Sequence, residues 1–225
     1  MLIWKFFALS FSALLPLVNP LGSALIFLGL VGSAPSSVYH SLARRIAINT
    51  ALFLVIIDLV GSTVLDFFGI SLPIVQVSGG LVIAAIAWTM LNQQDPSTSS
   101  TDKIQAAVQA QADDVEGTLL QKTFYPFTFP ITAGPGTTVV MLTLSSQIPL
   151  HPFTHSILAH VGLFIAILLL SVAVYFCYAY APRLTRTIAP STAHGILRVI
   201  SFILLCIGVQ IAWNGMVPLI NSLHR

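Results

Sequence analysis

Six long apolar runs divide this chain, and each is long enough to cross a lipid bilayer as a helix. A transmembrane helix needs about 20 predominantly apolar residues. The runs cover residues 6–31, 46–65, 70–91, 123–146, 156–181 and 199–223. Only 7% of the 225 residues are charged, against about 25% in soluble domains. The sequence therefore predicts an all-α membrane protein with six transmembrane helices, and it excludes a large aqueous domain.

One polar segment, residues 93–122, separates the third apolar run from the fourth. It is rich in Ser, Thr, Gln and Asp, and we interpret it as a linker between two three-span halves at 1–92 and 123–225. Because each half has an odd number of spans, halves that share a fold insert into the membrane in opposite directions. This is the inverted repeat of many transporters.

The basic residues predict the orientation of the chain. Lys5 and Arg225 lie near the termini, and the other Lys and Arg residues fall in the first, third and fifth loops: Arg44, Arg45, Lys103, Lys122, Arg183, Arg186 and Arg198. Since cytoplasmic loops carry an excess of basic residues, these loops and the linker are predicted to be cytoplasmic and both termini to lie outside. The net charge of +2 indicates no nucleic-acid partner.

Each half opens with a span that carries helix-breaking residues near its middle. The first span contains PLVNPLG, and the fourth contains PITAGPG. A proline inside a helix costs about 3 kcal/mol, and an unsatisfied backbone group in hydrocarbon adds to that cost. Broken backbone is tolerated at membrane depth where it is buried in protein or lines a cavity. Two breaks at similar depth therefore predict a shared binding site.

The two breaks offer groups that suit both ends of a zwitterion. A half-helix that begins after a break presents free N–H groups and the positive end of its dipole to an anion such as a carboxylate. Carbonyl groups freed before the break suit an ammonium group or a small cation. The predicted substrate-binding residues are Asn19, Pro20, Gly22, Thr132, Gly134, Pro135, Gly136 and Thr137. The alternative is that these residues only kink the helices and let them pack closely.

Three polar residues outside the breaks are candidates for supporting or coupling roles. Asp58 lies inside the second span, where ionisable residues normally mark ion or proton paths. It either serves such a path or sits protonated or paired with a polar neighbour. Gln210 and Asn214 lie one turn apart on the sixth span and either bond toward the broken segments or join helices.

The histidines and cysteines of the chain are interpreted without a metal-binding or catalytic role. The stretch HPFTHSILAH holds His151, His155 and His160, but the residue before a proline disfavours helix, so His151 does not stack over His155. We predict outer-loop histidines and no metal site. Cys177 and Cys206 lie in apolar runs and are interpreted as small buried hydrophobes. The sequence contains no nucleophile motif or phosphate-binding loop, so we predict neither an enzyme nor a cofactor.

Several ordered motifs resemble the MarC family of six-span bacterial inner-membrane proteins, over almost the whole chain. They are LLPLVNPLG followed by FLGL, FGISLP at 68–73 followed by Gly79 and Gly80, TAGPGT at 132–137, and GVQIAWNG at 208–215. The resemblance implies an inverted pair of three-span units, periplasmic termini, and kinship with LysE-type exporters and small neutral amino-acid transporters. Thr138 departs from the family pattern, which has an aliphatic residue there. Its hydroxyl either alters ligand choice or bonds the preceding turn.

Our leading hypothesis is a secondary transporter or exporter of a small polar solute, with a small neutral amino acid as the first candidate. It would work by alternating access at a midplane site between the two broken helices. The expected partners are the solute, the lipid bilayer, a proton or sodium ion as candidate coupling ion, and a second copy of the chain in a candidate homo-oligomer. The alternatives are a channel, or a non-transporting membrane assembly or regulatory subunit that uses the kinks for assembly.

Overall fold

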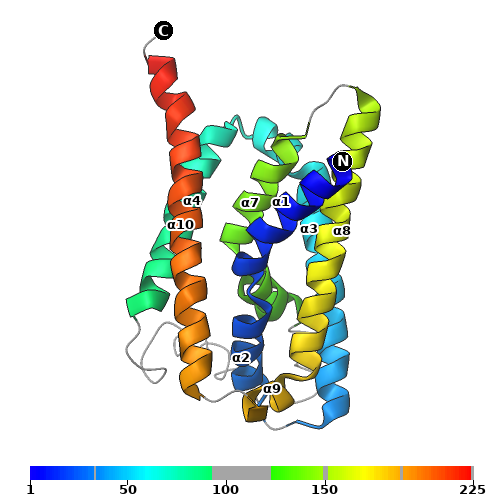
Figure 1. Cartoon of the computed structure of the whole chain (residues 1–225). Coiled ribbons are helices and arrows are strands. Elements are labelled where there is room, and N and C mark those ends of the chain that lie inside the picture. Colours follow the sequence, from blue (N-terminus) through cyan, green and yellow to red (C-terminus); the bar gives the residue numbers. More distant parts are fainter. Residues whose placement is uncertain (33, 93–122, 149–151, 188–189, 224–225) are drawn as a thin grey trace.

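The computed structural model describes residues 1–32, 34–92, 123–148, 152–187 and 190–223 (Figure 1). Its elements in chain order are α1 (Leu2–Val18), α2 (Pro20–Val31), α3 (Ser36–Phe67), α4 (Leu72–Asn92), η1 (Thr123–Thr132), α7 (Pro135–Ser146), α8 (Phe153–Ala179), α9 (Ala181–Thr187) and α10 (Pro190–Leu223). Five helical segments are long and apolar enough to cross a membrane, and η1 with α7 forms a sixth span when the bent pair counts as one. The predicted all-α membrane protein is confirmed.

The helices extend beyond the apolar runs that predicted them. The second span was predicted to start at residue 46, but α3 begins at Ser36. Tyr39, Leu42 and Ala43 of its early turns are buried in an apolar cluster. This buried face stabilises the helix beyond the apolar run. The short helix α9 was not predicted, and its first residue, Ala181, is buried in the same cluster.

The two ends of the helix bundle hold different parts of the chain (Figure 1). The start of α1, the end of α10 and the connection from α3 to α4 lie at one end, which we call the terminus end. The end of α2 and the helix α9 lie at the opposite end, which we call the α9 end. The start of α1 and the end of α10 thus lie at the same end of the bundle, and the side of the membrane that this end faces stays a prediction.

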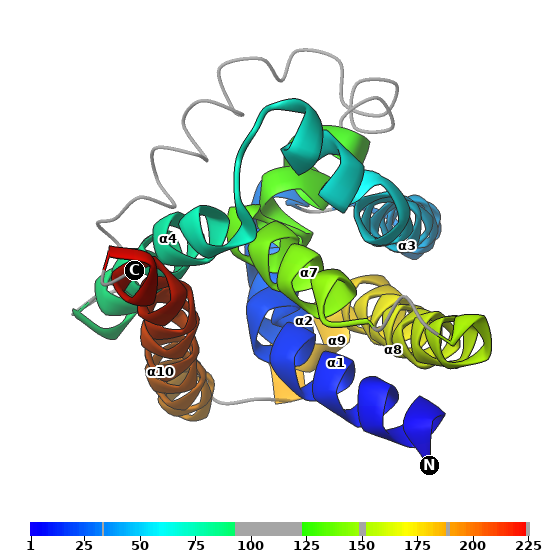
Figure 2. The same ribbon diagram turned by 90° about the horizontal axis from the view of Figure 1, so that it is seen from above.

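α4 and α10 make the most extensive contact between two helices, and they stand together at one side of the bundle (Figure 2). Glycines allow this close approach. A Cβ at Gly80 would lie 2.4 Å from the main-chain nitrogen of Ala212, and a Cβ at Gly208 would lie 2.6 Å from the main-chain nitrogen of Ala84. Small residues at such crossings let the backbones of membrane helices pack directly.

Each broken span packs against the long second helix of the other predicted half. α1 and α2 contact α8, whereas η1 and α7 contact α3. The long helices α3 and α8 also contact each other, so both broken spans pack against the same pair of helices. The division into repeats at 1–92 and 123–225 stays a prediction, and the linker at 93–122 lies outside the described residues.

Candidate functional site

The first break is a single residue, Asn19, between α1 and α2. Its φ of 41° and ψ of 66° lie in the left-handed region, which asparagine tolerates better than most residues. Its side-chain Oδ1 accepts a hydrogen bond from the N–H of Gly22 at 3.1 Å, so Asn19 caps α2. Pro20 follows at the first position of α2, where its missing N–H is tolerated. Pro16 does not break α1, which continues to Val18.

Gly22 accommodates the amide of Asn19. A Cβ at Gly22 would lie 2.2 Å from Nδ2 of Asn19 and 3.0 Å from a methyl group of Leu197. In the next position, the hydroxyl of Ser23 donates to the main-chain carbonyl of Asn19 at 2.8 Å. The first break is therefore shaped by contacts among residues of its own turn.

The second break follows η1, a segment whose helical turns are interrupted by extended backbone at Tyr125 and Phe129. The N–H of Ala133 donates to the carbonyl of Thr128 at 2.8 Å, five residues back instead of the usual four. The peptide bonds before Pro126 and Pro130 are cis. The axis of α7 is bent by 69° from that of η1, so the break predicted in the fourth span is present and the segment before it is not an ordinary α-helix.

α7 begins at Pro135, directly after the second break. The preceding residue, Gly134, is extended, with φ −85° and ψ −174°, and no side chain caps the helix. Thr137 in the first turn is 1% exposed. Thr138, which departs from the expected family pattern, donates its hydroxyl to the carbonyl of Gly134 at 3.2 Å. Of the two interpretations of Thr138, the structure supports the bond to the preceding turn.

Gly136 brings the second break against the first broken span. A Cβ on Gly136 would lie 3.2 Å from Cδ2 of Leu17, close to the end of α1, and 2.8 Å from Cγ1 of Ile83 on α4. The start of α7 therefore packs beside the last turn of α1. The two breaks, far apart in the sequence, are close in space.

Tyr178 of α8 lies between the two broken spans, and it is a residue that sequence reasoning missed. Its hydroxyl lies 2.7 Å from Oγ1 of Thr132 at the end of η1. The hydroxyl of Ser23, in the first turn of α2, is close to it and gives its own proton to the carbonyl of Asn19. Thr132 gives its one hydroxyl proton to the carbonyl of Phe127 at 2.7 Å, so Tyr178 is the donor to Thr132. The ring of Tyr178 stacks on Phe27, with the ring centroids 4.6 Å apart.

Two apolar clusters lie around the breaks, one toward each end of the bundle, and Tyr178 itself belongs to the second. The cluster toward the terminus end includes Leu14, Ile83, Ala133, Val140 and Leu170. The cluster toward the α9 end includes Val18, Phe27, Ile46, Phe127 and Val174. Ser23, Thr132 and Tyr178 are all at most 4% exposed. In this conformation these three side chains are buried, whereas Asn19 and Gly134 at the breaks are partly buried and Pro135 is exposed.

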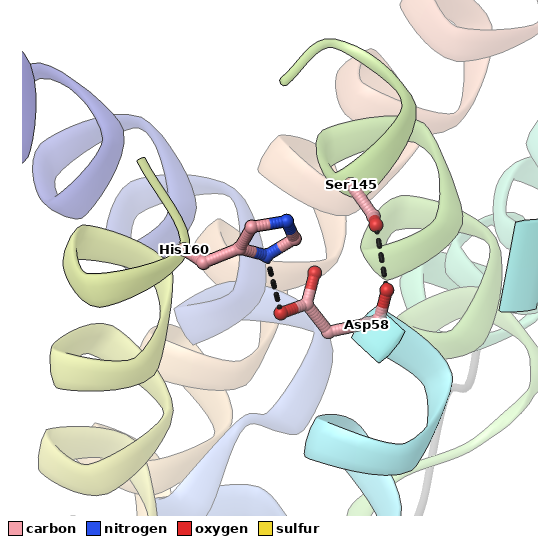
Figure 3. A network of polar contacts seen from close by, with 3 residues as sticks. All are labelled: Asp58, Ser145 and His160. Carbon is pink, nitrogen blue, oxygen red and sulfur yellow. Dashed lines mark hydrogen bonds and ion pairs between the residues drawn. The ribbon is translucent and has the colours of Figure 1, made fainter. Parts of the chain in front are cut away.

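Asp58 is paired, and its partner is His160 of α8 (Figure 3). Oδ2 of Asp58 lies 2.9 Å from Nδ1 of His160, and Asp58 is 7% exposed. Oδ1 of Asp58 is buried and has no hydrogen-bond partner among the described residues. The hydroxyl of Ser145, in the last turn of α7, donates to the main-chain carbonyl of Asp58 at 2.8 Å. Of the interpretations of Asp58, pairing with a polar neighbour matches the structure.

The prediction of outer-loop histidines is wrong for His160. It lies on α8, which begins at Phe153, and it faces a buried carboxylate. His155 is exposed near the start of α8, and His151 lies outside the described residues. The pairing of His160 was missed because its partner is on another helix, so its spacing in the sequence carries no signal.

The structure does not bring Gln210 and Asn214 to the breaks. Nε2 of Gln210 donates to Oδ1 of Asn214 at 2.9 Å, and both residues are exposed on α10. α10 turns its small residues toward α4 instead. Both cysteines are free, as expected, but Cys206 is exposed on α10 and Cys177 is only partly buried.

Comparisons with known proteins agree on one family. A family model described as MarC family integral membrane protein matches residues 4–220. Inner membrane proteins named MarC from Salmonella paratyphi B and Salmonella typhimurium are each 28% identical to the chain over 222 residues, and one from Escherichia coli O1:K1 is 27% identical. Each of these alignments covers 99% of both chains. No solved structure matches the chain.

Proposed function

Because the chain belongs to the MarC family of integral membrane proteins, we propose that it is a secondary transporter of a small polar solute. The first candidate is a small neutral amino acid, moved by alternating access around the two breaks. The chain is a multi-pass inner membrane protein. The excess of basic residues in the first, third and fifth loops favours periplasmic termini.

The observation that carries the proposal is the polar link between the breaks. Tyr178 hydrogen-bonds Thr132, next to the second break, and its ring stacks on Phe27 of α2, while the hydroxyl of Ser23, next to the first break, lies close to the Tyr178 hydroxyl. Buried polar groups in a membrane protein are costly unless they have partners, and they often mark a substrate path. Here the hydroxyl groups of three different spans meet between two irregular segments of backbone. A solute of similar polarity would exchange its own hydrogen bonds for the one between Tyr178 and Thr132.

The charge of the surrounding segments favours a solute without net charge. None of the residues of α2, η1 or α7 is acidic or basic. A solute with a net charge would enter a region that offers no countercharge, and this is costly inside a membrane. A zwitterion or a neutral polar molecule balances its own charges.

The two half-helices differ in what they offer the solute. The first turn of α2 already has a cap, since Oδ1 of Asn19 accepts from the N–H of Gly22. α7 has no side-chain cap, and its N-terminus at Pro135 opens toward the second break. The positive end of a helix dipole attracts an anionic group. We therefore assign the solute carboxylate to the first turn of α7, beside Gly136 and Thr137.

The two apolar clusters supply the gates that alternating access requires. With both clusters closed, the hydroxyl groups between the breaks are buried, as they are in this conformation. Opening one cluster at a time would expose the same polar link first to one side of the membrane and then to the other. A permanently open channel would instead leave these hydroxyl groups exposed.

Solute counterflow in proteoliposomes tests the proposal. Vesicles loaded with unlabelled alanine, glycine, serine or threonine should take up the same labelled solute transiently and with saturation. Tyr178→Phe removes the linking hydroxyl and should abolish this uptake, whereas Tyr175→Phe makes the same change elsewhere on α8 and should retain it. Absence of saturable flux for all four solutes refutes the proposal and leaves an assembly role. Uptake that never saturates indicates a channel.

A further inference from the structure

The pair of Asp58 and His160 is separate from the link between the breaks. His160 and Tyr178 lie on the same helix, about 27 Å apart at about 1.5 Å per residue. His160 is near the start of α8, at the terminus end of the bundle (Figure 1). The pair therefore lies between the breaks and the terminus end, on helices α3 and α8.

The carboxylate of Asp58 is incompletely satisfied. One oxygen, Oδ2, meets His160, but Oδ1 is buried without a hydrogen-bond partner among the described residues. With a neutral imidazole, the pair carries one negative charge. Such a charge away from water is costly unless it is neutralised. One additional proton makes the pair neutral.

Within the described part of the chain, the elements packed around the pair offer no other buried charge. α7 and η1 have no acidic or basic residue, and the ionisable residues nearest in the chain on α1, α3 and α8 are all exposed: Lys5, Asp66 and His155. His40, Arg44 and Arg45 lie near the start of α3, toward the α9 end. A proton is therefore the available partner for the charge of Asp58.

We propose that Asp58 and His160 form a proton-binding site that couples proton movement to the solute transport proposed above. The inference rests on that function, and it identifies the coupling ion. A hard metal cation takes several oxygen ligands, whereas this pair offers one carboxylate and an imidazole nitrogen. The nearby hydroxyl of Ser145 is already bonded to the main chain of Asp58.

His160 supplies a path between the buried carboxylate and the outside of the helix bundle. Its side chain is 36% exposed, and its second ring nitrogen points away from Asp58 (Figure 3). Histidine is well suited to a proton shuttle because both ring nitrogens exchange protons. A proton binds at Nε2 while the proton on Nδ1 moves to Oδ2 of Asp58. The result is a neutral acid beside a neutral imidazole, and release reverses the two steps.

Two helices connect this site to the breaks. α8 carries both His160 and Tyr178, and α7 runs from the second break at Pro135 to Ser145, which holds the main chain of Asp58. Protonation of the pair replaces the hydrogen bond from His160 to a charged carboxylate by a weaker bond between two neutral groups, and this loosens the contact between α3 and α8. Both α7 and α8 run from the Asp58–His160 pair to the breaks. A change in the packing of α3 against these two helices therefore alters the packing at the breaks.

Transport driven by a pH gradient tests the coupling. Proteoliposomes that contain a pH-sensitive dye should show proton movement that accompanies alanine uptake in the wild type. Asp58→Asn and His160→Gln should lose this proton movement and the accumulation driven by a pH gradient, yet keep alanine counterflow, which needs no net proton release. Asp66→Asn and His155→Gln make the same changes at exposed positions of the same helices and should behave as wild type. Accumulation by Asp58→Asn equal to wild type overturns the inference.

A second measurement needs no solute, so failure of the transport proposal is distinguishable from failure of the proton site. In protein labelled with 15N-histidine, the ring signals of His160 are assigned by their loss in His160→Gln and followed against pH. Asp58→Asn should shift the titration of His160, and Asp58→Glu, which keeps the carboxylate, should restore much of the wild-type behaviour. An unchanged titration in Asp58→Asn overturns the inference. Absent counterflow with a shifted titration refutes only the transport function.

Discussion

Replacing Asn19 tests whether the first break is built into the local sequence. Asn19 combines two features, a left-handed backbone at φ 41° and a side chain that caps α2 through Gly22. Alanine removes the cap and tolerates the left-handed region poorly. Glycine also removes the cap but adopts positive φ freely. The two substitutions therefore separate the backbone contribution from the side-chain contribution.

The expected magnitudes follow from these two features. Loss of an asparagine cap to alanine costs about 1 kcal/mol, whereas loss to glycine costs only a few tenths. A residue with a Cβ in the left-handed region pays roughly 1–2 kcal/mol. We therefore expect Asn19→Ala to lower the free energy of unfolding by about 2 kcal/mol and Asn19→Gly to lower it by less than about 1 kcal/mol.

Unfolding by SDS in mixed micelles, followed by far-UV circular dichroism, measures these differences in free energy. Asn92→Ala is the matched control, because Asn92 is exposed at the end of α4 and, among the described residues, its side chain bonds only the preceding turn. The free energy of unfolding of Asn92→Ala should remain close to that of the wild type. Equal losses for Asn19→Ala and Asn19→Gly, or no loss for Asn19→Ala, would refute the left-handed break.

Three further predictions concern packing and orientation. In SDS unfolding, Gly208→Val should destabilise the protein by about 1–3 kcal/mol through overpacking against the backbone at Ala84. The control is Gly195→Ala, which should be neutral or stabilising because an added Cβ there has no neighbour within 4 Å. Phe27→Ala removes a fully buried ring stacked on Tyr178 and should cost about 3–5 kcal/mol; a loss below about 1 kcal/mol contradicts that packing. A cysteine placed in the first turn of α1 should react with an impermeant maleimide in intact spheroplasts, and one in α9 only after permeabilisation. The reverse pattern contradicts periplasmic termini.

The two breaks were predictable because proline, glycine and asparagine act locally. The sequence located the first break near Asn19 and the second near Gly134, and the structure has both. The shape of η1 was not predictable, because hydropathy and the presence of proline do not specify the extended backbone at Tyr125 and Phe129 that interrupts its turns. Helix-breaking residues show where a helix ends but not what replaces it.

Tyr178 and His160 were missed for a different reason. Each lies in an apolar run with no motif around it, and each has a partner on another span. Their roles follow from the contact of α8 with α2 and α3, which hydropathy does not specify. Asp58 was predicted as a candidate because a single acid inside an apolar run stands out by itself. Its pairing with His160 could be found only from the fold, which brings α3 and α8 together.

Protection of single cysteines by solute tests most directly whether the two breaks form one site. Cys177 and Cys206 are first replaced by alanine, and Ser23→Cys or Thr137→Cys then places one thiol beside the first or the second break. The account predicts that a transported solute slows alkylation of both thiols with the same half-saturating concentration, and that a thiol at exposed Ser78 is unaffected. Protection of only one break, or of neither, by a solute that shows saturable counterflow would contradict the shared site.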